Sequence, residues 1–162
     1  MGRVKWVFGI GLALCGMFLA LQVQAVPGLV SHVENFAALG DRARAARLPI
    51  LLLVSRSDCP YCELLKREIL RPMLISGDYD GRVLIRELLI DSELSVRDFD
   101  GRAVVPDALA KRYRVRLTPT VLFLDDRGRE LAERIIGINT VDFYAYYLDA
   151  AIDAAGAHLA KD

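Results

Sequence analysis

Two cysteines three positions apart, Cys59 and Cys62, are the residues of this chain best suited to carry chemistry. The motif Cys59-Pro60-Tyr61-Cys62 follows the apolar run Pro49–Val54 and opens a segment with helical spacing, which places the first thiol at a helix N-terminus. There the helix dipole and the unpaired N–H groups stabilise a thiolate. Pro60 suits the first helical position, where no N–H is needed. The pattern predicts thiol–disulfide exchange, with a purely structural disulfide as the alternative.

The composition predicts one globular domain, since the chain has 162 residues, of which 54% are hydrophobic and 26% charged. The formal net charge is zero, which gives no reason to expect nucleic acid or a membrane surface as a partner of the folded part. The third cysteine, Cys15, lies in an N-terminal apolar stretch, and the two histidines, His32 and His158, lack the spacing of zinc ligands. We therefore expect no metal, and no cofactor besides a redox-active disulfide between Cys59 and Cys62.

Residues 1–25 have the pattern of a secretory signal peptide. Arg3 and Lys5 precede a long apolar run, and Ala25 occupies a position at which a signal peptidase would cut. The alternative is an uncleaved N-terminal membrane anchor, in which case the chain meets the membrane only through this leader. Both interpretations place the domain of residues 26–162 in an oxidising compartment, most simply a bacterial periplasm.

Apolar periodicity predicts an α/β domain. Helices are expected at Leu29–Ala46, from Pro60 to a kink or stop at Pro72, from Pro106, and after Thr140 as the N-cap. Strands are expected at Ile50–Val54, Arg82–Asp91 and Thr120–Leu124, with a return strand at Glu130–Ile136. Residues 92–105 are polar and predict a loop or a partly ordered insertion. This order describes a central mixed β-sheet flanked by helices on both faces.

The order of these features resembles the thioredoxin superfamily. The cysteine motif follows a buried strand, Thr118-Pro119 comes about sixty residues later before a hairpin, and a helix closes the chain. With its leader, the insertion around Phe99-Asp100-Gly101 and the run of residues 115–120, the chain is most similar to periplasmic thioredoxin-like proteins associated with sulfur-oxidation operons. The resemblance implies a thioredoxin-like fold and a protein-disulfide oxidoreductase.

The same resemblance implies a role for each motif residue. Cys59 would be the exposed nucleophile and Cys62 the resolving thiol. Pro119 would be a cis-proline that faces the disulfide, and Thr118 would dock the extended chain of a partner by strand addition. Tyr61 is expected at the surface, where it helps to shape the entrance.

Three features depart from ordinary thioredoxins. Leu53 stands where many thioredoxins have a buried aspartate beneath the cysteines, and Asp58 stands where they have a tryptophan. Glu87, which interrupts an apolar strand face, is a possible replacement for that aspartate as the proton acceptor of Cys62. The alternative for Glu87 is an edge position at which it meets water. The Pro60-Tyr61 pair occurs in glutaredoxins and some periplasmic isomerases, so the direction of electron flow stays open.

The sequence as a whole predicts a periplasmic oxidoreductase that acts on protein thiols and disulfides. We expect a reductant that receives electrons from a donor in the membrane. A disulfide isomerase or oxidase of secreted proteins is the alternative within the same class of enzyme. From a different class, the two thiolates of Cys59 and Cys62 could bind Cu(I).

Overall fold

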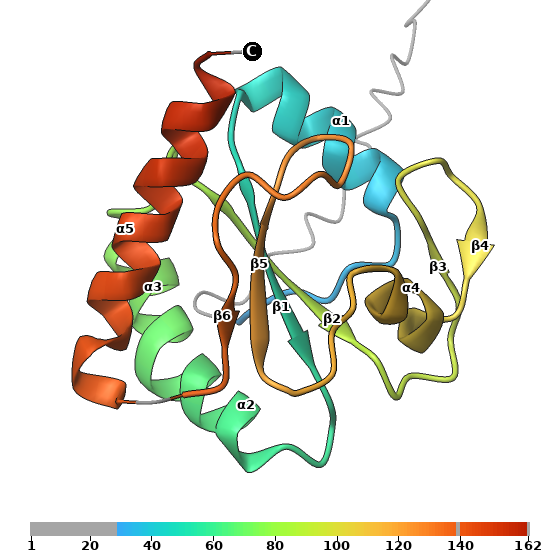
Figure 1. Cartoon of the computed structure of the whole chain (residues 1–162), viewed down its shortest axis with the longest axis horizontal. Helices are drawn as coiled ribbons and strands as arrows, with labels where there is room; N and C mark the ends of the chain where they lie inside the picture. Colours follow the sequence, from blue (N-terminus) through green and yellow to red (C-terminus); the bar gives the residue numbers. More distant parts are fainter. Residues whose placement is uncertain (1–28, 139, 162) are drawn as a thin grey trace, which may run out of the picture.

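A four-stranded mixed sheet forms the centre of the structure, which is a computed structural model that describes residues 29–138 and 140–161. The strands lie in the order β2-β1-β5-β6 (Figure 1). Their bounds are β1 Ile50–Ser55, β2 Leu84–Leu89, β5 Thr120–Leu124 and β6 Ile135–Ile136. β1 pairs with β2 in parallel and with β5 antiparallel, and β5 pairs antiparallel with β6. The predicted signal peptide, residues 1–25, lies outside the described residues.

Helices cover both faces of this sheet, as the sequence predicts (Figure 1). One face carries α1 (Phe36–Ala46) and α4 (Pro106–Arg112). The other carries α5 (Val141–Leu159) and a helical segment made of α2 (Pro60–Leu65), a π-helical turn η1 (Lys66–Leu70) and α3 (Arg71–Ser76). No helix in these ranges is long and apolar enough to cross a membrane.

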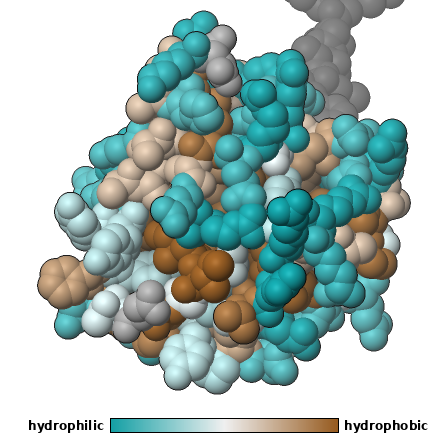
Figure 2. Space-filling view, in the orientation of Figure 1, coloured by the Kyte–Doolittle hydropathy of each residue, from teal (hydrophilic) through white to brown (hydrophobic). Residues whose placement is uncertain are grey.

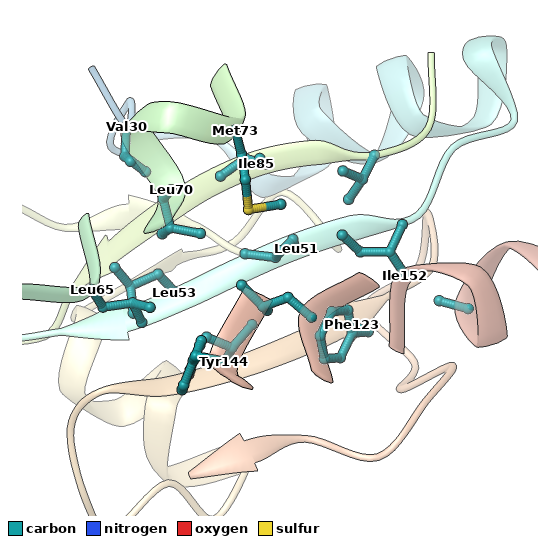
Figure 3. Close-up of a cluster of buried hydrophobic side chains, with 14 of the residues drawn as sticks. Val30, Leu51, Leu53, Leu65, Leu70, Met73, Ile85, Phe123, Tyr144 and Ile152 are labelled. Atoms are coloured by element: carbon teal, nitrogen blue, oxygen red, sulfur yellow. The ribbon is translucent and has the colours of Figure 1, made fainter. Parts of the chain in front are cut away.

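β1 is buried along its whole length because it contributes to two hydrophobic clusters. Leu51 and Leu53 face α2, α3 and α5, whereas Leu52 and Val54 face α1 and α4. In the first cluster, shown in Figure 3, Leu65 packs against Leu53. Fully burying a leucine side chain stabilises a fold by about 1.5 to 3 kcal/mol. This packing holds α2, and with it the cysteine motif, against the centre of the sheet.

The first helix begins later than its periodicity predicts. Instead of starting at Leu29, α1 begins at Phe36. Asn35 is its N-cap, and the side-chain oxygen of Asn35 accepts a hydrogen bond from the N–H of Ala38 at 3.0 Å. An asparagine in this position satisfies one of the free N–H groups of a first helical turn.

The residues before Asn35 run along the open edge of β2 instead of forming a helix. The N–H of Val33 donates to the carbonyl of Glu87 at 2.9 Å, and the N–H of Glu87 donates to the carbonyl of Ser31 at 3.0 Å. Without this pairing the buried backbone of β2 would lack partners, a cost that outweighs helical periodicity. His32 therefore lies directly beside Glu87.

The helix that opens at Pro60 does not stop at Pro72. The backbone widens into the π turn η1, in which the N–H of Arg71 donates to the carbonyl of Lys66, and then continues to Ser76 as α3. A proline has no N–H and its ring clashes with the carbonyl four residues earlier, so a wider turn lets the chain pass it.

The insertion at residues 92–105 is more ordered than the sequence predicts, since it contains the hairpin of β3 (Val96–Arg97) and β4 (Ala103–Val104). At its turn the buried Asp98 carboxylate accepts hydrogen bonds from Arg112, at 2.7 Å, and from the N–H groups of Arg102 and Asp100. These bonds, that of Arg112 above all, lower the pKa of Asp98. These hydrogen bonds fix the geometry of the turn, although its polar sequence predicts a loop.

The return strand is shorter than the range Glu130–Ile136 that the sequence predicts. Only Ile135–Ile136 forms a strand, while Glu130 makes a single bridge to Leu124. The N–H of Leu131 donates to the carbonyl of Phe123 at 2.8 Å, and the following residues leave the sheet to line a groove against α5. The segment thus pairs with β5 only near its two ends.

Two helical glycines predict opposite effects on stability. A Cβ atom at Gly40 would lie 2.3 Å from the backbone oxygen of Asp126, whereas one at Gly156 would meet nothing within 4 Å. We expect Gly40→Ala to lower the free energy of unfolding by about 1 to 3 kcal/mol, because rigid backbone cannot yield to the methyl group. Gly156→Ala should raise it by about 0.5 to 1 kcal/mol through helix propensity. Urea denaturation measures both, and shifts of the same sign would contradict this account.

Candidate active site

Cys59 and Cys62 form a disulfide at the start of α2, with their Cα atoms 5.2 Å apart. Cys59 is the N-cap of the helix, and its sulfur accepts a hydrogen bond from the N–H of Cys62 at 3.1 Å. The two cysteines differ in access, since Cys59 is 8% exposed and Cys62 is 0% exposed. Both cysteines are thus largely buried, and Cys59 is the more accessible of the two.

The loop between β1 and Cys59 is held by the end of the neighbouring strand. The N–H and the hydroxyl of Ser57 both donate to the Asp91 carboxylate, at 3.0 and 2.5 Å respectively. The bond from the Ser57 hydroxyl has the largest effect on the pKa of Asp91 and lowers it, and the bond from the Ser57 N–H lowers it further. Both bonds favour the charged carboxylate, which accepts them. In the same loop Arg56 and Asp58 form an exposed ion pair at 3.2 Å. The Asp58 carboxylate next to Cys59 thus has an opposite charge beside it.

The Thr118–Pro119 peptide bond is cis, as the resemblance implies. Val54 and Thr120 are partners in the antiparallel register of β1 and β5. The last residues of β1 and the first residues of β5 therefore lie side by side, at the same end of the two strands (Figure 1). The loop that leads to Cys59 leaves from this end. The structure therefore brings the proline and the cysteine motif to one side of the molecule.

Thr118 is one of the described residues in this segment whose backbone is free to bind a partner. The carbonyl of Pro119 accepts from the N–H of Gly137 at 2.8 Å, and that of Leu117 accepts from the Thr120 hydroxyl at 2.8 Å. Between them, the N–H and C=O of Thr118 have no hydrogen-bond partner in the part of the chain that the structure describes. A free donor and a free acceptor two residues before β5 can pair with an incoming strand.

Apolar side chains are exposed near the cysteine motif and near the strands that follow the cis-proline. Figure 2 shows apolar surface over β6 and toward the loop that leads into β5. Tyr61, Leu117 and Ile136 are 62%, 64% and 49% exposed. Exposed apolar groups of this kind suit contact with another protein.

Glu87 is buried, so the alternative of a solvated edge position is wrong. Its side chain is 1% exposed. Oε1 accepts hydrogen bonds from the Ser55 hydroxyl at 2.5 Å and from Lys66 Nζ at 3.0 Å, and His32 Nε2 lies 3.6 Å from Oε2. Burial lowers the pKa of Lys66, but hydrogen bonds to Glu63 and Glu87 outweigh it and raise this pKa above its usual value. The carboxylate is therefore paired with a charged ammonium group.

This carboxylate lies beneath the helix that carries Cys62. Glu87 is the register partner of Leu53, so it sits one strand to the side of the position at which many thioredoxins have their aspartate. The N–H of Lys66 donates to the carbonyl of Cys62, which places Lys66 one turn further along the same helix face. Because Lys66 reaches down to Glu87, the carboxylate and Cys62 share one side of the sheet.

Sequence reasoning missed the four residues that complete this site: Ser55, Lys66, His32 and Asp91. The position of Ser55 could have indicated a role in the site, because it is the polar residue that ends an apolar strand. The position of Lys66 is a weaker indication, since it follows Cys62 by one helical turn. The position of His32 could not be predicted, because the local periodicity indicates a helix from Leu29. His32 is placed instead by pairing with Glu87, which is distant in the sequence.

Comparisons with known proteins support this fold. Spinach chloroplast thioredoxin f, in its short form, is similar at 22% identity and a TM-score of 0.54, over 82% of this chain and 97% of its own. A DsbH oxidoreductase is similar at 18% identity and a TM-score of 0.58, over 83% and 92%. Thioredoxin O2 from Arabidopsis thaliana in the oxidised state matches at 18% identity and a TM-score of 0.52, over 79% and 99%.

No curated protein sequence matches this chain. At these identities the similar structures speak for the fold alone. The family is established by the sequence model of the thioredoxin-like domain, which matches residues 36–152 and so includes the cysteine motif, Glu87 and the cis-proline. This chain therefore belongs to the thioredoxin-like domain family.

Proposed function

We propose that this protein is a thiol–disulfide oxidoreductase that reduces disulfides of partner proteins in the periplasm. The unequal burial of its two cysteines carries the proposal, because Cys59 is 8% exposed at a helix N-terminus and Cys62 is 0% exposed behind it. A structural disulfide needs no such division. Thiol–disulfide exchange needs one sulfur that reacts with the partner and a second, shielded sulfur that then attacks the mixed disulfide.

In the first step, the Cys59 thiolate of the reduced protein attacks one sulfur of a partner disulfide. A bond forms between Cys59 and that sulfur, the partner's S–S bond breaks, and the electron pair leaves on the second partner sulfur, which takes a proton from water. The N–H at the start of α2 that reaches the Cys59 sulfur stabilises its charge before the attack. The free backbone groups of Thr118 hold the partner chain as an added strand.

In the second step, Cys62 resolves the mixed disulfide. Its thiol proton passes to the buried Glu87 carboxylate, and the Cys62 sulfur attacks the sulfur of Cys59. The Cys59–Cys62 disulfide forms, the bond to the partner breaks, and the partner leaves as a thiolate. Two electrons have then moved to the partner, and Ser55 and Lys66 keep Glu87 in place throughout.

The leader supports the proposed compartment, and the chemistry of the site supports the proposed electron donor. Residues 1–25 have the pattern of an export signal, which supports a periplasmic location. The disulfide is itself the redox group, so the proposed mechanism uses no further cofactor. A reductant in an oxidising compartment needs a continuous supply of electrons, and a membrane protein with an exposed dithiol would provide it.

The reduction potential of the Cys59–Cys62 couple tests the direction of electron flow. For a reductant we expect a value near that of thioredoxin, about −270 mV. A value between about −180 and −120 mV would instead support the alternative isomerase or oxidase, which Pro60-Tyr61 and Thr118 allow. Equilibration of the purified protein with glutathione or dithiothreitol buffers measures it. Failure to exchange with any protein disulfide, in either direction, would overturn the proposed function itself.

A further inference from the structure

The two oxygens of the buried Glu87 carboxylate have different partners. Oε1 already accepts from the Ser55 hydroxyl at 2.5 Å and from Lys66 Nζ at 3.0 Å. Oε2 faces His32 Nε2 at 3.6 Å, and among the described residues it has no other hydrogen-bond or ion-pair partner. Since two donors occupy Oε1, Oε2 is the oxygen that can take up and release a proton.

His32 connects this oxygen to water. Its side chain is 55% exposed, in contrast to 1% for Glu87, and it lines a surface groove of about 410 Å³ together with Glu34 and Ser95. The backbone bonds of the neighbouring residues Ser31 and Val33 to Glu87 hold the histidine in register with the carboxylate. A separation of 3.6 Å allows an ion pair or one bridging water.

Of the groups around Glu87, only His32 can accept a proton near neutral pH. Lys66 is already protonated there, because its hydrogen bonds to Glu63 and Glu87 raise its pKa. The Ser55 hydroxyl is a donor to the carboxylate and is 0% exposed. A neutral imidazole has one ring nitrogen that accepts a proton and one that donates, so a histidine can both accept and release a proton. The remaining charged group on the histidine's side is the exposed Glu34 carboxylate.

We propose that His32 is the residue through which the buried Glu87 carboxylate exchanges its proton with solvent. The inference rests on the proposed function, and it concerns the second step alone. The proton of the Cys62 thiol passes to Glu87, from Oε2 to His32 Nε2, and from the imidazolium to water, which returns both groups to their starting states. His32 touches no reacting sulfur in this scheme and acts only through Glu87.

The test is single-turnover reduction of a peptide disulfide by the full-length protein, followed from pH 5 to 9. The first phase forms the mixed disulfide on Cys59 and the second releases the peptide thiol. We expect His32→Gln to slow the second phase about tenfold at pH 7 and to change the pH dependence of that phase, since proton transfer by a placed side chain is lost. The first phase should keep its rate.

The chain offers a matched control, because it has only one other histidine. His158 lies in the last turn of α5, is exposed, and has no contact with Glu87, so His158→Gln should leave both phases unchanged. If His32 acts through Glu87, the double variant His32→Gln/Glu87→Gln should be no slower than Glu87→Gln alone. A wild-type pH profile in His32→Gln, or additive losses in the double variant, would overturn the inference. Absence of both phases in the unmodified protein would instead refute the proposed function.

Discussion

Replacing Cys62 with serine is expected to stop catalytic turnover and to leave the partner covalently attached to Cys59. The serine hydroxyl cannot attack the mixed disulfide, so the second step loses its nucleophile and turnover should fall more than about a thousandfold. The first step should continue, because Cys59 is the sulfur that a partner can reach and its position at the start of α2 does not depend on the sulfur of Cys62. Mass spectrometry of the protein after reaction with a peptide disulfide would show one added peptide on Cys59.

Cys59→Ser is the matched control for this experiment. It removes the more accessible cysteine and keeps the fully buried one, so neither turnover nor a trapped peptide is expected. The Cys62 side chain is 0% exposed, which should protect it from direct attack in the folded protein. Efficient turnover by Cys62→Ser, or a peptide trapped on Cys62 in place of Cys59, would contradict the proposed division of roles.

Replacing Glu87 with glutamine is expected to slow the second step about a hundredfold at pH 7, within the range of general base catalysis. Glutamine keeps the shape of the side chain and can still accept from Ser55, but it cannot take the proton of Cys62. That proton must then go to water or hydroxide. The rate of the variant should therefore rise about tenfold per pH unit until an ordinary thiol ionises, at about pH 8.5.

The sign of this pH dependence distinguishes a base from a structural carboxylate. The deficit of Glu87→Gln should be large near neutral pH and should shrink as pH rises, whereas a disturbed fold would slow the reaction at every pH. Glu63→Gln is the matched control, since Glu63 also pairs with Lys66, at 2.6 Å, but its side chain is 57% exposed. Stopped-flow measurement of the second phase compares the two variants. Equal pH profiles would remove Glu87 from the mechanism.

Glu87→Gln should still fold, because Lys66 keeps an opposite charge beside it. The Lys66 ammonium is 2.6 Å from Glu63 and 22% exposed, so the variant does not leave an isolated charge in the core. This contrasts with removal of one member of a fully buried ion pair, which costs about 3 to 5 kcal/mol. A loss of the second phase in this variant can therefore be assigned to the missing base once an unchanged unfolding transition has been recorded.

The sequence by itself determined the features that depend on neighbouring residues. A continuous apolar run is typical of a strand covered on both faces, which identified β1. The hairpin turn that follows Thr120–Leu124 identified β5. Proline at the first helical position and a cysteine as N-cap are local choices, and they identified the start of α2 and the site of the disulfide. Family resemblance added the cis bond before Pro119, which spacing alone could not supply.

The tertiary structure alone decided what surrounds Glu87. Four separate segments of the chain meet there, from His32 at the sheet edge to Lys66 on the helix, with Ser55 and Glu87 on adjacent strands. No periodicity links these residues, and the pattern around His32 predicted a helix because pairing with β2 is invisible in a local window. Leaving a buried charge unpaired costs free energy, so the fold must place partners beside it. Those partners come from segments that are distant in the sequence. The sequence therefore located the two cysteines, whereas only the packing of the folded chain showed the polar groups that we propose to move their protons.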